Sequence, residues 1–256
     1  MRRSSNRNEK RALAPWVSAL LFVVILLVVW QVVALAVNAN YIMPSPAEVA
    51  VRAIELIPTP DFWLAVGITA LRVFVGFAVG MVLGIGLALL MSAMPRVLQV
   101  FSPFIKLLRT TPVVCFILLM LLWIRADNLP VIISALAVLP IAWTNTLEGL
   151  KSVDGRYLEL AQAFELSGGA RLRKILLPAI WPQLASAAGV GMGIAWKSGV
   201  TAEVLSLPLW GMGTGIYHAK IGLAAADVFV WTIVIVLISI GIEHALRALA
   251  RKAQGE

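Results

Sequence analysis

Residues 157–178 read YLELAQAFELSGGARLRKILLP, a polar stretch in an otherwise apolar chain. Two acids, Glu159 and Glu165, stand in its first half, and three bases stand in its second half. Of the 256 residues, 61% are hydrophobic and 13% are charged, whereas an ordinary soluble domain has about 25% charged residues. The composition therefore predicts a polytopic, all-α membrane protein in which this polar stretch connects two spans.

Six charge-free windows are candidate spans, at residues 14–37, 73–95, 110–124, 128–147, 175–196 and 228–242. About 20 helical residues are needed to cross the hydrocarbon core, so the third and sixth windows cross only if polar flanking residues are tolerated. The first window exceeds the apolar region of a signal peptide, which is about 7–15 residues long. We therefore expect a retained first span, with cleavage after it as the alternative, and a single transmembrane domain over 14–256 behind a basic tail at 1–13.

The lysines and arginines predict the orientation of these spans. If the N-terminus is cytoplasmic, sixteen of them fall on the cytoplasmic side: in the tail, in the loop between spans two and three, in the loop between spans four and five, and at the C-terminus. Three fall in the outer loops. Basic residues concentrate on the cytoplasmic side of membrane proteins. Both termini and residues 157–178 are accordingly predicted to be cytoplasmic, and the net charge of +8 points to membrane lipid rather than to nucleic acid.

The fourth-to-fifth loop, residues 148–174, is longer than a plain connection requires. Helix-forming residues fill its first half, and Gly168-Gly169 is expected to break the helix before a second short helix leads into the fifth span. One interpretation is a solvated loop whose charges only set the topology. The other is a docking helix for a cytoplasmic partner.

The same stretch resembles the coupling loop of bacterial ABC importer permeases, written EAA, three residues, G, nine residues, I-x-L-P. Glu159-Leu160-Ala161 stands at EAA, Glu165 at the glycine, and Ile175, Leu177 and Pro178 at I-x-L-P. The departures are Leu160 for alanine and Glu165 for glycine, and Gly168-Gly169 is a candidate replacement for the lost turn. The resemblance implies an ATPase-coupling loop at 148–178 whose contact residues are Glu159, Leu160, Ala161, Ala163, Glu165, Ser167, Gly168, Gly169, Arg171, Ile175, Leu177 and Pro178.

Further segments, in order along the chain, are similar to the nitrate/sulfonate/taurine branch of these permeases. They are Trp30 with Met43-Pro44-Ser45-Pro46, Arg72-Val73 with the following glycines, Arg109-Thr110-Thr111-Pro112, and Trp196 with Ala202-Glu203 and Gly211-Met212-Gly213. The resemblance implies a type I importer fold with about six spans. It also implies a pair of permeases, expected to be two copies of this chain, in the cell membrane, with two cytoplasmic ATPases and an external binding protein.

The expected cargo is a small anion such as a sulfonate, taurine or nitrate, with a pyrimidine or riboflavin-like vitamin precursor as the alternative. The chain has no Gly-x-x-x-x-Gly-Lys-Ser/Thr phosphate loop. ATP and Mg²⁺ are therefore expected on the partner ATPase, with no cofactor or metal in this chain. A self-sufficient secondary transporter is the next alternative. An intramembrane enzyme would need a nucleophile and base or a metal cluster, and neither stands out.

Individual residues carry further expectations. Gly76, Gly80 and Gly84 recur every four residues and so share a helix face, which favours packing against another span of the same chain. The candidates for the translocation path or a gate are Trp196, Lys197 and Glu203. Lys197 and Glu203 are ionisable, and charges near a span are costly and often line a path. For Glu203 the alternatives are a structural pin at the dimer interface and a residue already in water. Arg72 is expected to anchor the end of a span.

Overall fold

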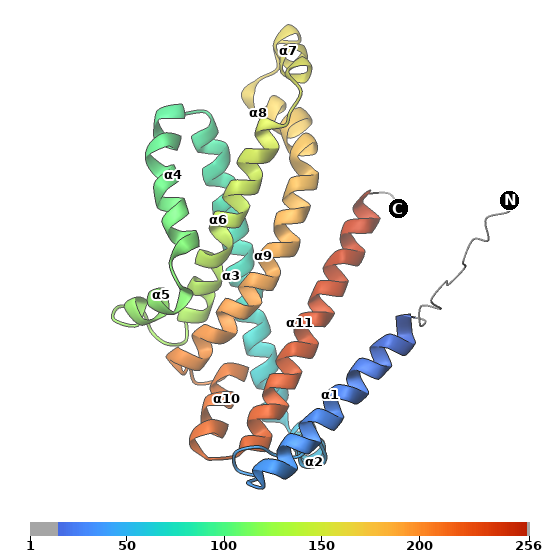
Figure 1. Ribbon diagram of the computed structural model, residues 1–256. Coiled ribbons are helices and arrows are strands. Elements are labelled where there is room, and N and C mark those ends of the chain that lie inside the picture. Colours follow the sequence, from blue (N-terminus) through green and yellow to red (C-terminus); the bar gives the residue numbers. More distant parts are fainter. Residues whose placement is uncertain (1–14, 255–256) are drawn as a thin grey trace, which may run out of the picture.

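The computed structural model describes residues 15–254, which form eleven α-helices and one π-helical turn (Figure 1). In chain order they are α1 Pro15–Val37, α2 Pro46–Leu56, α3 Pro60–Ser92, α4 Pro95–Thr110, α5 Val113–Met120, α6 Leu129–Lys151, α7 Gly155–Ala163, α8 Gly168–Arg171, η1 Leu172–Leu176, α9 Leu177–Ser206, α10 Met212–Ile221 and α11 Ala225–Gln254. The expected all-α membrane fold is confirmed, because five of these helices are long and apolar enough to cross a membrane.

The centre of the molecule is a layer of three helices, in which α6 packs against both α3 and α9 (Figure 1). On α3, a Cβ added at Gly76, Gly80 or Gly84 would lie 2.4–2.6 Å from a carbonyl oxygen of α6. Real Cβ atoms do not approach other atoms this closely, so glycine is required for the two backbones to touch. The three glycines therefore lie in a contact between two helices of one chain.

The flanking helices α1 and α11 are more exposed than the central layer (Figure 1). Only 6% of the apolar window of α1 is buried inside the protomer, and its leucines and valines point outward. A helix that is hydrophobic all round and unburied by protein is expected to face lipid. Trp30 of α1 fixes its lower end by stacking on Phe229 of α11, at 5.1 Å between ring centroids, and by donating to the Pro44 carbonyl at 2.9 Å.

The prediction that residues 110–124 form the third span is wrong. The structure instead has two helices, α4 and α5, which meet at an angle of 98°. Pro112 lacks an N–H donor and disfavours helical geometry at the residue before it, and Thr111 is extended, with ψ at 131°. Lys106 and Arg109, which the charge pattern assigned to a cytoplasmic loop, lie on α4. The pair is a sixth crossing only if it is counted as one broken span.

Four other spans extend beyond their charge-free windows. The second is α3, which begins at Pro60 and carries Arg72 within it, and the fourth is α6, which continues past Glu148 to Lys151. The fifth is α9, which continues past Trp196 to Ser206, and the sixth is α11, which begins at Ala225. A window ends at the first charge, whereas a helix continues through a charged residue whose side chain has a partner or reaches water.

The loop between α6 and α9 projects from one end of the bundle, with α7 as its tip (Figure 1). The first residues of α1 and the last residues of α11 lie toward this end, and α2 and α10 lie at the other. The second half of the loop is continuous with a span, because α8, η1 and α9 form one helical run over Gly168–Ser206. A movement of α7 can therefore reach α9 through the turn at 164–167 and the helical run that begins at Gly168.

Candidate functional site

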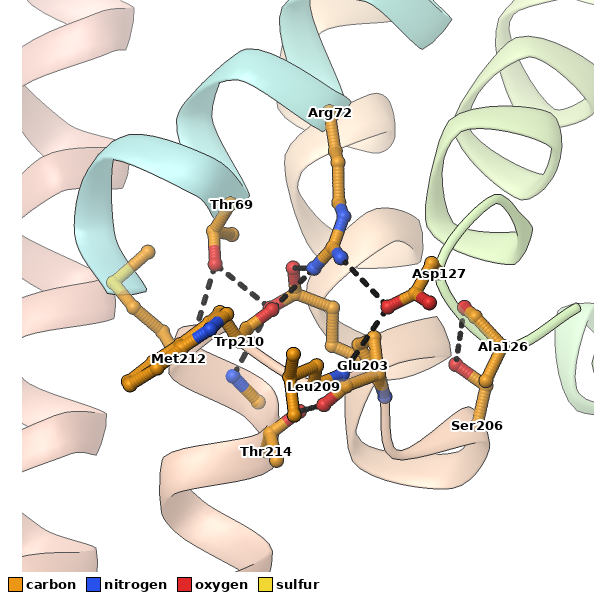
Figure 2. A network of polar contacts seen from close by, with 12 residues as sticks. Thr69, Arg72, Ala126, Asp127, Glu203, Ser206, Leu209, Trp210, Met212 and Thr214 are labelled. Atoms are coloured by element: carbon orange, nitrogen blue, oxygen red, sulfur yellow. Dashed lines mark hydrogen bonds and ion pairs between the residues drawn. The ribbon is translucent and has the colours of Figure 1, made fainter. Parts of the chain in front are cut away.

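A buried network of polar contacts surrounds Glu203 at the end of the bundle opposite α7 (Figure 2). Glu203 is 0% exposed. Its carboxylate accepts from the Thr69 hydroxyl at 2.8 Å, from the Arg72 guanidinium at 3.1 Å and from the Gly213 amide at 3.1 Å. A buried carboxylate persists only when such donors replace its hydration.

Arg72 extends the network to two further segments. Its guanidinium also contacts the Trp210 carbonyl and a carboxylate oxygen of Asp127, the latter at 3.3 Å. Asp127 in turn accepts from the Leu209 amide at 3.1 Å. The network thus joins α3, the segment before α6, α9 and the loop into α10 (Figure 2).

The network explains the glycines of the Gly211-Met212-Gly213 segment. A Cβ at Gly211 would lie 2.6 Å from the Glu203 carboxyl carbon, and one at Gly213 would lie 2.6 Å from the Glu203 Cβ. The Met212 amide between them donates to Thr69 at 2.9 Å. The segment approaches Glu203 so closely that any side chain at 211 or 213 would displace it.

The candidate path residues occupy different surroundings. Trp196 is 1% exposed and donates its indole N–H to the Ile235 carbonyl of α11 at 3.2 Å. Glu203 is enclosed by the network, whereas Lys197 is exposed and has no ion pair with any described residue. The expectation that Arg72 anchors a span end is wrong, since it pairs with Glu203 and Asp127 inside the fold. A role for Trp196, Lys197 or Glu203 in the path stays a prediction.

Sequence-local contacts hold both ends of α7. Asp154 caps its first turn by accepting from the Arg156 amide and side chain, both at 2.9 Å. The Arg156 side chain, followed by its backbone N–H, lowers the pKa of the Asp154 carboxyl from its usual range. At the other end, the Leu166 amide bonds to the Ala161 carbonyl at 2.9 Å and the Glu165 amide to the Gln162 carbonyl at 3.0 Å. These two bonds form a Schellman cap.

Glu165 occupies the left-handed position of this cap, with φ at 49°. A non-glycine residue there costs about 1–2 kcal/mol, which explains why the coupling-loop pattern has glycine at this position. The expectation that Gly168-Gly169 breaks the helix is wrong. The two glycines begin α8, behind the N-cap Ser167, and the turn is made at 164–166 without them. Glu165 retains the turn because backbone hydrogen bonds hold it in place.

The surface of α7 carries an apolar stripe, formed by Tyr157, Leu160 and Phe164. These side chains are 58%, 54% and 71% exposed. Their spacing of three and four residues places them on one face of the helix. An exposed apolar face on a projecting helix is typical of a protein-binding surface.

The remaining coupling-loop residues lie around this helix. Glu159 and Ala163 of α7 are exposed, as are Ser167, Gly168, Gly169 and Arg171 before and within α8. In contrast, Ala161 is only 2% exposed. Ile175 belongs to η1, and Leu177 and Pro178 begin α9. A cavity of about 500 Å³ is lined by Ile175 and Pro178 on one side and by Asp154 and Tyr157 at the base of α7 on the other.

Sequence reasoning missed several residues of both regions. Thr69 and Asp127 carry no local signal, because their partners lie far along the chain. The apolar stripe was detectable, since Tyr157, Leu160 and Phe164 follow the helical period. Within residues 15–254, no group of three or more His, Cys, Asp or Glu side chains could hold a metal ion.

Comparisons with known proteins agree with the coupling-loop resemblance. Residues 80–254 match the family described as "Binding-protein-dependent transport system inner membrane component". SsuC of Bacillus subtilis, a permease protein named for the transport of aliphatic sulfonates, is 27% identical over 93% of this chain and 86% of its own. The taurine transport system permease protein TauC of Escherichia coli is 26% identical, over 90% and 85%. The nitrate import permease protein NrtB of Synechocystis is 30% identical, over 86% and 81%.

Solved structures share the fold. A bacterial alginate ABC transporter, in complex with its pentasaccharide-bound periplasmic protein, has a chain that superposes with a TM-score of 0.64 over 78% of this chain and 82% of its own, at 16% identity. An inward-facing structure of the MetNI methionine ABC transporter gives 0.61 over 75% and 94%, at 18% identity. Since the family match covers more than half of its length, the chain belongs to the binding-protein-dependent transport system inner membrane components, the multi-pass, non-catalytic permease subunits of ABC importers.

Proposed function

We propose that this permease carries a small anion, of the sulfonate, taurine or nitrate class, into the cytoplasm. The external binding protein delivers the anion, and two ATPase subunits drive the transport. Two copies of this chain form the translocation path between them. The named cargoes of the three relatives support the anion class.

The observation that carries the coupling proposal is the apolar stripe of α7. Three large side chains are more than half exposed on a helix that projects from the bundle. The stripe is the part of the loop suited to enter a groove on the ATPase, with Glu159, Arg171 and the other exposed residues at its rim. Ala161 is buried within the chain itself. We therefore assign it to the turn at the end of α7 rather than to the contact with the ATPase.

Topology supports the same assignment. The base of α7 and the described ends of α1 and α11 lie toward the same end of the bundle (Figure 1). The basic residues of the sequence concentrate in the segments at that end. By the positive-inside rule this is the cytoplasmic end, where the ATPases would dock. The binding protein would then face α2, α10 and the Glu203 network.

The test compares charge substitutions on opposite faces of α7. Leu160→Glu and Phe164→Glu each place a carboxylate in the stripe, and Gln162→Glu places one on the opposite, exposed face. We expect the first two to lose co-purification of the ATPase from the native host and the third to retain it. Retention in all three variants would refute docking through the stripe.

Cargo is tested separately with the intact complex. ATP-dependent uptake of labelled taurine, pentanesulfonate and nitrate into proteoliposomes is compared with uptake of a neutral pyrimidine and of riboflavin. Uptake of an anion supports the proposal, whereas uptake of only the neutral compounds would replace the anion with a vitamin precursor. Uptake without ATP by the permease alone would favour a secondary transporter.

A further inference from the structure

The helix α4 has three distinct faces. Ile105, with Leu98 and Leu108, packs against α3 and α6, and Val100, Phe104 and Leu107 form an exposed apolar face. The third face carries polar residues at helical spacing, and we call it the cationic face of α4. Its members are Gln99, Ser102, Lys106 and Arg109.

The cationic face lies beside α6, which is one of the helices long and apolar enough to cross a membrane. Ile105 belongs to a core cluster with Trp143 of α6, and the Arg109 guanidinium donates to the Thr144 hydroxyl at 3.5 Å. At 1.5 Å per residue, Thr144 lies about 10 Å from the Lys151 end of α6 and about 22 Å from the Leu129 end. Arg109 is therefore held beside the body of α6, and Lys106 lies about one turn before it on the same helix, rather than in a loop.

These cations differ from the other arginines held in the fold. Arg52 pairs with Glu55 and Asp227, and Arg72 pairs with Asp127 and Glu203. By contrast, among the described residues no carboxylate lies within 4 Å of Lys106 or Arg109. Glu148, one turn beyond Thr144 on the same side of α6, is exposed and pairs with neither.

An unpaired charge at membrane depth is costly in lipid and is found where it faces water or a passing ion. The apolar face of α4 offers lipid a surface of its own, so the cationic face is free to point elsewhere. Building on the proposed function, we propose that the cationic face of α4, together with Thr144, lines the translocation path and attracts the transported anion. Lys106 and Arg109 supply the positive potential, and Ser102 supplies a hydroxyl donor. The Thr144 hydroxyl donates to the Pro140 carbonyl at 2.7 Å and accepts from Arg109, so Thr144 positions the guanidinium.

Lys106 and Arg109 at this position would favour a negatively charged cargo. A path lined by charges of one sign raises the local concentration of the opposite ion about tenfold or more. A neutral vitamin precursor would gain nothing from the two cations. Two cations on the path would therefore favour an anion over a neutral precursor as the cargo.

The test measures the charge of the path without any cargo. Cys115, an exposed free cysteine, is first replaced by serine. Ser102→Cys, one turn from Lys106, is then reacted in nanodiscs with anionic sulfonatoethyl and cationic trimethylammonioethyl methanethiosulfonate. The ratio of the two rates is compared with that of a free thiol, which cancels any change in thiolate fraction. Phe104→Cys on the apolar face is the matched control.

We expect Ser102→Cys to react about tenfold faster with the anionic reagent, relative to the free thiol. Adding Lys106→Gln should lower that preference severalfold, and Lys106→Arg should retain it. Phe104→Cys should react slowly with both reagents. Size-exclusion profiles of all variants establish that each is folded.

Two results would overturn the inference. Equal relative rates at Ser102→Cys would mean that no cationic path exists there, and rates as slow as those of Phe104→Cys would mean that lipid or protein covers the face. Because labelling requires no ATPase, either result leaves coupling through α7 intact. Conversely, loss of ATPase docking would refute the coupling proposal without changing the labelling pattern.

Discussion

The Glu203 network and the α7 loop lie at opposite ends of this permease and are built by opposite means. In the network, residues far apart in sequence meet, and Glu203 is enclosed with three donors. In the loop, the contacts are local caps, and the largest side chains remain exposed. An enclosed charge network holds one geometry, because losing any partner leaves a buried charge unpaired. An exposed apolar helix gains its partner only in a complex.

The two ends therefore suit different tasks. The network fixes the relative positions of α3, α9 and α10 at the end opposite α7. The loop presents the short helix α7, which a turn joins to the continuous run of α8, η1 and α9. Since α9 contributes both Glu203 and the continuation of the coupling loop, a displacement of α7 would act on a helix that is pinned at its far end.

Of the substitutions that test this comparison, removal of the Glu203 carboxylate is expected to have the largest effect. We expect Glu203→Ala to lower the free energy of unfolding by about 3–5 kcal/mol, because Arg72 is left buried without its enclosed partner. The measurement is unfolding of the purified permease in mixed micelles. Glu159→Ala on exposed α7 is the control and should change it by less than about 0.5 kcal/mol. Equal effects of the two substitutions would show that the network is not a structural pin.

Glycine substitutions sharpen the comparison. Gly213→Ala places a Cβ 2.6 Å from the Glu203 Cβ and 2.7 Å from the Val200 carbonyl, and backbone on one side cannot yield. Overpacking of this kind costs about 1–3 kcal/mol. Gly168→Ala, which has nothing within 4 Å, should be neutral or slightly stabilising. The same unfolding assay reports both, and a harmless Gly213→Ala would contradict the close approach described for this segment.

The smallest expected effect lies in the cap of α7. Glu165→Gly should stabilise the α7 cap by about 1 kcal/mol, since glycine adopts the left-handed conformation without the steric penalty. Amide hydrogen exchange of α7 measures this locally, as slower exchange at Leu166 and Phe164. Glu159→Gly, in the helix interior, should instead speed exchange by a similar free energy. Faster exchange in Glu165→Gly would mean that the Glu165 side chain makes a contact worth more than the strain.

Local sequence patterns predicted much of the fold. The apolar runs located most of the spans, the small-residue period of α3 indicated its packing face, and the spacing of Glu159 and Pro178 located the loop between α6 and α9. Span ends were less predictable. The predicted second span began only after Arg72, because a charged residue limits a charge-free window. The partners of Arg72, Asp127 and Glu203, are distant in the sequence and lie beside it only in the folded chain.

The sequence by itself determined the class of this protein, its helices and its polar loop, because hydrophobicity, helical period and capping are properties of neighbouring residues. Tertiary structure alone decided which charges are paired. It enclosed Glu203 between Thr69, Arg72 and Gly213. It also placed Lys106 and Arg109 beside α6 instead of in a loop. The physical reason is that a charge is stabilised by whatever surrounds it in space, and sequence order does not specify those surroundings.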